Sequence, residues 1–178
     1  MLLGVLRRNQ RLSAWANWVV ADPRPAAQEI RGFLETCFAN IASNRKKKFL
    51  HRIGSADADG VDSALHEMVA QELLRRFHLQ PEFDPKLSDG LTPDMIAKVA
   101  NQQFIVDVFL TRNPSRTIKP LDFTLSGLSQ NAQYTVDSGE RAKKIRDTIV
   151  GKHSKYSRTG KPMILVVLRC LIPTASGT

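Results

Sequence analysis

The sequence predicts an α/β fold, namely a three-layer α/β/α sandwich with a mixed central sheet, preceded by an N-terminal helical hairpin. Three observations support this prediction. Residues 92–99 and 103–110 are two short apolar runs joined by a polar turn, the pattern of an antiparallel β-hairpin. Residues 162–170 form a continuous apolar run, which is typical of a strand covered on both faces. A helical pattern over 137–156 lies between them, so the last strand is expected to run parallel to an earlier one.

The length and composition are those of a globular protein. A chain of 178 residues can form one domain with a hydrophobic core and a small helical extension. Hydrophobic residues make up 42% and charged residues 24%, which excludes a disordered chain. We divide the sequence into a helical extension with a basic patch over 1–53, a core over 62–170 and a flexible tail over 171–178.

The net charge indicates the kind of binding partner, and the cysteines indicate the cellular compartment. The formal net charge is +9 and the pI is about 9.9, which points to a polyanionic partner such as nucleic acid. Cys37 and Cys170 are far apart in the sequence, as suits a reducing compartment. The first residues do not resemble a signal peptide, and no apolar run approaches the roughly 18 residues of a membrane span. We therefore expect a cytoplasmic protein that does not contact membranes.

The N-terminal third is predicted to be helical and basic. Residues 8–20 and 26–42 carry apolar side chains at helical spacing and predict the two helices of the hairpin. A dense basic cluster follows, formed by Arg45, Lys46, Lys47 and Lys48. The cluster is either an arm that binds phosphates with salt-dependent affinity or a solvated helix end. We interpret residues 54–60 as a linker.

A helix is expected over residues 62–77, capped by Asp62 or Ser63. Its apolar side is predicted from a four-residue repeat formed by Leu65, Val69, Leu73 and Phe77. Glu67 and Glu72 flank this stripe. The ordinary explanation for both is a surface position, paired with Arg75 or Arg76.

The predicted hairpin carries one acid in each strand. Asp94 opens the first strand directly after Pro93, and Asp107 lies inside the second, on the same face as Ile105 and Phe109. A carboxylate among apolar neighbours is costly to bury unless it meets a cation, a metal or good hydrogen-bond donors. Two such acids on adjacent strands can hold a divalent metal together. The alternative is that Asp107 faces water from an edge strand and Asp94 caps a turn.

The segments on either side of this hairpin have distinct patterns. Residues 78–84 predict a short strand that Pro81 confines to an edge of the sheet. Residues 112–134 are polar and show no periodicity, so we expect a loop insertion there. Arg112 and Arg116 make this insertion basic and place it among the candidate ligand contacts.

The predicted helix over 137–156 has one lysine on its inner side. Ala142, Ile145, Ile149, Lys152 and Tyr156 follow one another at steps of three or four, so they share one side of the helix. The ammonium group of Lys152 is thereby directed toward the sheet. In the alternative arrangement, the stem of Lys152 packs while its ammonium group reaches solvent.

Over residues 62–169, these features resemble the PD-(D/E)XK nuclease superfamily, which has the restriction-endonuclease-like fold. The family pattern is a helix with a Glu, a strand with Pro-Asp, a strand with an acid followed two positions later by lysine, then a helix and a buried strand. The best matches are Glu67, with Glu72 as a second choice, for the helical Glu; Pro93 and Asp94 for the Pro-Asp; and Asp107 for the second acid.

One position departs from the family pattern. Phe109 stands where the family has lysine. Some members supply the lysine or another polar group from the following helix, and members similar to the RecB-type nucleases have Gln-x-x-x-Tyr there. Lys152 and Tyr156 occupy the equivalent positions, so the resemblance implies that Lys152 is a migrated lysine.

The resemblance implies a metal-dependent endo- or exonuclease that hydrolyses phosphodiester bonds in nucleic acid, DNA in preference to RNA. Asp94 and Asp107 would hold Mg²⁺, with Mn²⁺ as a substitute, and Glu67 would be an inner or water-mediated ligand. Lys152 would orient the nucleophile or stabilise the transition state. The expected nucleic-acid contacts are Arg45, Lys46, Lys47, Lys48, Arg112, Arg116 and Tyr156.

Two other functions are compatible with the sequence. Phe109 favours a catalytically inactive nucleic-acid-binding module with the same fold. The third possibility is an interaction domain without a nucleic-acid role, in which the positive charge serves solubility.

Overall fold

The computed structural model describes residues 1–83, 85–87, 90–111 and 138–169. The helices in this part of the chain are α1 (Leu2–Arg8), α2 (Ala14–Ala21), α3 (Pro25–Ala39), α4 (Ser43–Ser55), α5 (Ala58–Arg76) and α6 (Ser138–Tyr156), followed by the short 3₁₀ helix η2 (Ser157–Thr159). The strands are β1 (Gln80–Phe83), β2 (Met95–Val99), β3 (Gln102–Thr111) and β4 (Met163–Arg169). The chain therefore has the α/β fold that the sequence predicts.

The four strands form one mixed sheet in the order β1-β2-β3-β4. β1 pairs with β2 and β2 with β3 in the antiparallel direction, whereas β3 and β4 run parallel. The β2–β3 hairpin is closed by two residues, since Val99 pairs with Gln102, and Ala100 in this turn has a φ of 48°. Tight hairpin turns need such positive φ values because their twist then matches that of the strands. The predicted hairpin, edge strand and parallel last strand are confirmed.

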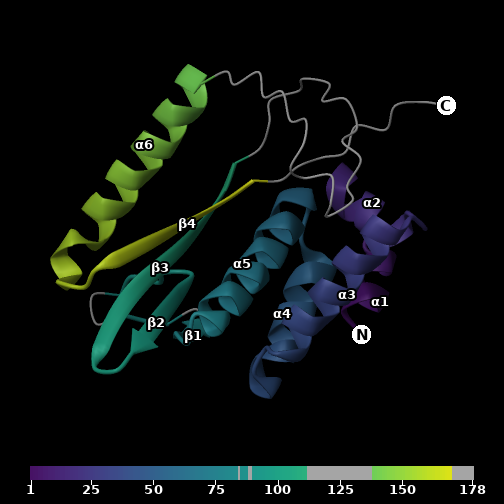
Figure 1. Ribbon diagram of the computed structural model, residues 1–178, viewed down its shortest axis with the longest axis horizontal. Helices are drawn as coiled ribbons and strands as arrows, with labels where there is room; N and C mark the ends of the chain where they lie inside the picture. Colours follow the sequence, from purple (N-terminus) through teal and green to yellow (C-terminus); the bar gives the residue numbers. More distant parts are fainter. Residues whose placement is uncertain (84, 88–89, 112–137, 170–178) are drawn as a thin grey trace.

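Helices α5 and α6 lie on opposite sides of the sheet in Figure 1. Side chains alternate along β3, so Val106 and its same-face neighbours Phe104 and Val108 join the core cluster that includes Leu65 and Met68 of α5. Asp107 points the other way and meets side chains of α6, as described below. The same alternation that builds the core on one face of β3 thus places a carboxylate on the other.

The N-terminal helices form a larger assembly than the predicted hairpin. α2 and α3 correspond to the two expected helices and pack against each other, but α1 packs against α2, α3 and α4, and both α3 and α4 pack against α5. Leu2, Leu34 and Ile53 belong to the same hydrophobic cluster as the residues of α5 and the sheet. Figure 1 shows these helices gathered on the α5 side of the molecule.

The predicted linker over 54–60 is wrong, and so is the predicted start of the next helix. Helix α4 continues to Ser55 and α5 begins at Ala58, with Asp57 as its N-cap. The Asp57 carboxylate accepts a hydrogen bond from the backbone N–H of Gly60. Asp62 instead lies inside α5, buried, where Oδ1 accepts a hydrogen bond from the hydroxyl of Ser13.

The four-residue repeat identified only part of the buried side of α5. Leu65 is buried, but 37% of Leu73 and 75% of Phe77 are exposed. Four residues turn a helix by about 400°, so such a repeat drifts by about 40° per step and leaves the buried face. In addition, α5 packs against α3, α4 and the sheet, and is therefore buried on more than one side.

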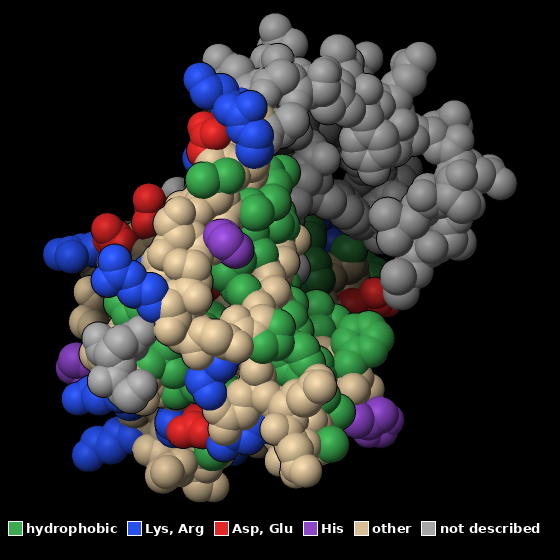
Figure 2. All heavy atoms as spheres, turned by 90° about the vertical axis from the view of Figure 1, so that its left-hand side faces the viewer, with side chains coloured by type: hydrophobic (Ala, Val, Ile, Leu, Met, Phe, Trp, Pro, Cys, Tyr) green, Lys and Arg blue, Asp and Glu red, His purple; other side chains and the backbone are tan. Residues whose placement is uncertain are grey.

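Strand β4 is less covered than its sequence suggested. It lies at one end of the sheet, beside β3, and 40% of Val167 is exposed. Figure 2, which views the α6 side, shows hydrophobic side chains at the surface and Lys and Arg side chains in several separate places. The positive charge therefore does not form one continuous patch on this face.

The predicted loop insertion over 112–134, with Arg112 and Arg116, and the predicted tail over 171–178 lie outside the described residues. Within the described ranges, none of the helices combines the length and hydrophobicity that crossing a membrane requires.

Candidate active site

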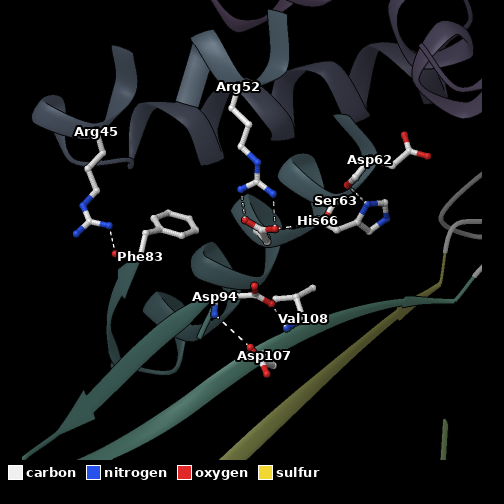
Figure 3. Close-up of polar contacts among 10 residues, drawn as sticks. Arg45, Arg52, Asp62, Ser63, His66, Phe83, Asp94, Asp107 and Val108 are labelled. Carbon is white, nitrogen blue, oxygen red and sulfur yellow. Dashed lines mark hydrogen bonds and ion pairs between the residues drawn. The ribbon is translucent and has the colours of Figure 1, made fainter. Parts of the chain in front are cut away.

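Asp94 and Asp107 are held together where β2 begins. β2 starts at Met95, opposite Val106, so its ladder does not reach the backbone N–H of Val108. The Asp94 carboxylate fills this place and accepts a hydrogen bond from Val108 N at 2.7 Å through Oδ2. The backbone N–H of Asp94 in turn donates to Oδ1 of Asp107 at 3.1 Å. Figure 3 shows the backbone N of Asp94 joined to the Asp107 carboxylate, and the Asp94 carboxylate next to Val108.

Asp107 is a buried carboxylate with a cationic partner. Its exposed fraction is 1%, so the alternative in which it faces water is wrong. The ammonium nitrogen of Lys152 lies 2.9 Å from Oδ2. Among the described residues, Oδ2 receives no hydrogen bond of ordinary geometry, so this ion pair is its main compensation for burial.

Lys152 and Tyr156 reach Asp107 from one side of α6. They are four residues apart, which places them on the same face of the helix. The hydroxyl of Tyr156 donates to Oδ1 of Asp107 at 3.4 Å. The Lys152 side chain as a whole remains 30% exposed. The inward position predicted for Lys152 is thus the one observed.

Tyr156 does not have the surface position that a nucleic-acid contact requires. It is 2% exposed, and burial, followed by the nearby charge of Asp107, raises the pKa of its phenol above the ordinary value. The phenol is therefore a hydrogen-bond donor to Asp107. We correct its expected role from phosphate contact to positioning of this carboxylate.

Glu67 is buried and paired with an arginine that the sequence analysis did not select. The Arg52 guanidinium of α4 donates to both Glu67 oxygens, at 2.6 and 2.7 Å, and the Ser63 hydroxyl donates to Oε1 at 3.2 Å. Glu67 therefore does not lie on the surface beside Arg75 or Arg76. Figure 3 shows the head group of Arg52 directed toward the sheet from the side on which α5 lies, whereas the Asp107 carboxylate lies on the other side of β3.

Glu72 is bonded to residues outside the candidate site. It is buried, and it accepts hydrogen bonds from Arg75, Arg76 and Asn40. These donors, the Arg75 guanidinium first, hold the pKa of Glu72 at about 2. The pairing with Arg75 and Arg76 is as predicted for this residue, although Glu72 is buried rather than exposed. It is not part of the Asp94 and Asp107 group.

The pKa of Asp94 indicates that the predicted site residues influence one another. Its pKa is raised to about 6, mainly by burial and to a smaller extent by the charges of Glu67 and Asp107, while the hydrogen bond from Val108 and the charge of Lys152 act in the opposite direction. The groups that act on Asp94 are thus the three other members of the predicted catalytic set. Acids with raised pKa values next to other acids are typical of functional sites.

The acid pair suits a divalent metal, but the predicted set of three ligands is not assembled. No group of three or more His, Cys, Asp or Glu side chains is arranged to hold a metal within the described ranges, and Glu67 is engaged by Arg52. Mg²⁺ commonly uses one or two carboxylates and completes its shell with water and phosphate oxygens. Asp94 and Asp107 supply this number of carboxylates, with Oδ2 of Asp107 paired with Lys152 and Oδ2 of Asp94 bonded to Val108 N.

The predicted basic cluster lies in the first turns of α4, which begins at Ser43, so it is at a helix end, as in the second of the two expected arrangements. Arg45 donates to the carbonyl oxygen of Phe83. The ammonium group of Lys46 donates to the carbonyl oxygen of Ala39 at 2.9 Å. Lys47 and Lys48 are exposed. The four side chains therefore point to different surroundings and do not act as one patch.

Arg52 is not among the residues predicted for the site, because the prediction rests on the run of adjacent basic residues and not on their helical spacing. Arg45, Lys48 and Arg52 are separated by three and four positions, which places them on one face of α4. This spacing was the available indication that the three cations belong together.

No protein-family model, curated protein or solved structure matches this chain.

Proposed function

We propose that this chain is a metal-dependent nuclease of the PD-(D/E)XK type, which hydrolyses phosphodiester bonds in DNA in preference to RNA. One observation carries the proposal: the Asp107 carboxylate on β3 accepts a hydrogen bond at 3.1 Å from the backbone N–H of Asp94, directly before β2, and lies 2.9 Å from the ammonium group of Lys152 on α6. We further propose that α6, the sheet and the helices around α5 form the three-layer sandwich of that superfamily. The spacing of the cysteines supports a cytoplasmic location for this activity.

The acid pair would hold the cofactor. Asp94 and Asp107 would coordinate Mg²⁺, or Mn²⁺ in its place, and Glu67 would contact it through water because Arg52 occupies its carboxylate. When bound, such an ion supplies a Lewis acid that acidifies water and neutralises charge on the phosphate. Burial of Asp107 and its bond to Asp94 N fix the orientation of the acids before any ligand arrives.

Lys152 would take over the role of the lysine that Phe109 replaces. Phe109 shares the Asp107 face of β3, so a lysine there would reach the same space that Lys152 reaches from α6. With 30% of its side chain exposed, Lys152 can contact a phosphate oxygen and still remain close to Asp107. Its charge would stabilise the transition state, and Tyr156 would keep the Asp107 carboxylate in place.

The proposal is tested by Mg²⁺-dependent cleavage of single- and double-stranded DNA. The parent protein should cleave at least one of these substrates, whereas Asp107→Ala should be inactive. Asp147→Ala is a matched control, because Asp147 is an exposed acid on α6 that pairs with Arg146. Equal activity of the parent and Asp107→Ala would reject the assignment.

A non-catalytic nucleic-acid-binding module is the second candidate, and the ion pair between Arg52 and Glu67 favours it. In that case the buried acids are neutralised by Arg52 and Lys152 and have no need of a metal. Calorimetric titration with Mn²⁺ in the presence of uncleavable DNA separates the two functions. Metal binding that Asp94→Asn abolishes supports the nuclease, and absence of metal binding supports the module.

Salt dependence separates both candidates from an interaction domain without a nucleic-acid role. Binding through phosphate contacts weakens steeply as salt increases, because counterions released from the nucleic acid drive the association. Retention on heparin or DNA that does not respond to salt would reject both nucleic-acid functions.

A further inference from the structure

A pocket lies between α4, α5 and β1, next to the candidate active site. Its volume is about 270 Å³, and its lining includes Arg45, Lys48 and Arg52 from one face of α4. The rest of the lining is formed by Glu67 of α5 and by the side chains of Ile41, Phe49 and Phe83. The opening is therefore a cationic pocket with an aromatic lining.

The charges of the pocket suit a doubly charged anion. Three cations and one carboxylate line it, which leaves two positive charges in excess. A phosphate monoester carries roughly 1.5 to 2 negative charges at pH 7, whereas a phosphodiester inside a nucleic-acid strand carries one. The terminal phosphate of a strand is thus the better electrostatic match.

Two of the cations are held in place in the absence of ligand. Arg45 is fixed by the carbonyl oxygen of Phe83, and Arg52 by two bonds to Glu67. Arginine binds phosphate through parallel N–H donors, and a guanidinium that is already oriented loses less entropy on binding. Lys48 is exposed and contributes the third positive charge of the pocket lining.

The size of the pocket limits what it accepts. Pockets that enclose drug-sized ligands usually span about 300–1,000 Å³, so a pocket of about 270 Å³ holds a phosphate and its adjoining sugar rather than a longer segment. Phe49 and Phe83, each 9% exposed, line the pocket and offer a small apolar surface to that sugar or to the first base.

Arg52 connects this pocket to the acid pair. It lines the pocket and also binds Glu67, whose charge acts on Asp94. A phosphate bound by Arg52 would therefore lie beside the candidate metal site and weaken the hold of Arg52 on Glu67. We infer that the pocket binds the terminal phosphate monoester of a nucleic-acid strand, which rests on the proposed nuclease function and makes the enzyme end-directed.

The test measures binding without catalysis. Fluorescence anisotropy in EDTA compares three versions of one single-stranded oligonucleotide, with a 5′-phosphate, with a 3′-phosphate or with hydroxyls at both ends. One phosphorylated version should bind at least 10-fold more tightly than the hydroxyl version, and millimolar inorganic phosphate should remove the difference. Equal affinity for all three versions would overturn the inference.

Variants assign the effect to the pocket. Arg45→Gln combined with Lys48→Gln should reduce the preference for the phosphorylated end to less than 2-fold. Lys143→Gln removes one positive charge from an exposed position of α6 outside the pocket lining and should keep the preference. If the double variant does not fold, Lys48→Gln alone should lower the preference at least 3-fold, since this side chain is exposed. An undiminished preference in a folded pocket variant would also overturn the inference.

The two proposals fail in different ways. A protein that prefers the phosphorylated end but cleaves nothing retains the pocket inference and loses the nuclease. A protein that cleaves DNA in an Asp107-dependent manner but ignores terminal phosphates retains the nuclease and loses the pocket inference. Failure of every oligonucleotide to bind would overturn the pocket inference, whereas the nuclease is decided by Mg²⁺-dependent cleavage alone.

Discussion

The ammonium group of Lys152 lies 2.9 Å from Oδ2 of Asp107, which links α6 to β3 across one face of the sheet. The carboxylate is 1% exposed and its Oδ2 receives no hydrogen bond from the described residues, so the lysine provides the compensating charge. Phe109, two residues after Asp107 on β3, carries no charge. The crossover helix therefore supplies the amine that the strand lacks.

Replacement of Lys152 by alanine should decrease the rate of DNA cleavage by roughly 10²–10³-fold, the usual loss on removing one group that stabilises a transition state. Steady-state cleavage assays with saturating Mg²⁺ measure this effect. Lys143→Ala is the control, because Lys143 is an exposed lysine on the same helix. A change of less than 3-fold in Lys152→Ala would contradict a role in catalysis.

Asp94→Asn should stabilise the metal-free protein at neutral pH. The pKa of Asp94 is raised from 3.8 to about 6, so the folded state binds this proton more tightly than the unfolded chain does. The free energy of unfolding therefore decreases as the pH rises from about 4 to 6, by at most about 3 kcal/mol, and is then level. Asparagine removes this penalty and can still accept the hydrogen bond from Val108.

Urea unfolding in EDTA at pH 4 and pH 7.5 measures the effect. Asp94→Asn should be more stable than the parent protein at pH 7.5, and the two should differ little at pH 4. Parallel pH profiles of the two proteins would show that the environment of Asp94 does not favour its protonated form.

Glu72→Gln should lower stability without lowering cleavage. The pKa of Glu72 is lowered from 4.5 to about 2, so its contribution is present above pH 4.5 and is lost as the pH falls toward 2. At pH 7 the loss should be about 2 kcal/mol, less than for fully buried ion pairs because Arg75 and Arg76 are half exposed. Thermal unfolding measures the stability.

Cleavage assays well below the unfolding temperature distinguish the role of Glu72 from that of Glu67. Glu67→Gln should reduce the apparent affinity for Mg²⁺, whereas Glu72→Gln should leave it unchanged. Loss of Mg²⁺ affinity in Glu72→Gln would instead favour Glu72 as the helical acid of the site.

Tyr156→Phe should have a small effect on the rate and none on DNA binding. The hydroxyl is buried and its bond to Asp107 is long, at 3.4 Å, so its removal should cost less than about 1 kcal/mol of stability. We expect kcat to fall less than 10-fold and KM to be unchanged. A large increase in KM with kcat unchanged would show that Tyr156 contacts the nucleic acid.

The local pattern of the sequence was sufficient for several elements. The alternation of side chains along residues 103–110 predicted β3 and assigned Asp107 to the face opposite Val106. The helical spacing of Lys152 and Tyr156 placed both side chains on the inner side of α6. These relationships depend on the geometry of a single strand or helix, which repeats every two or 3.6 residues. They do not require knowledge of the neighbouring elements.

Only the tertiary structure decided which charges meet. Glu67 and Glu72 both flank the same predicted stripe, yet Glu67 binds Arg52 of α4 while Glu72 binds Arg75 and Arg76 of its own helix. The sequence does not indicate that α4 crosses α5 at Glu67, because helix packing depends on the whole surface of both helices. Burial of a carboxylate, and hence its partner and its pKa, is a property of that packing and not of the local chain.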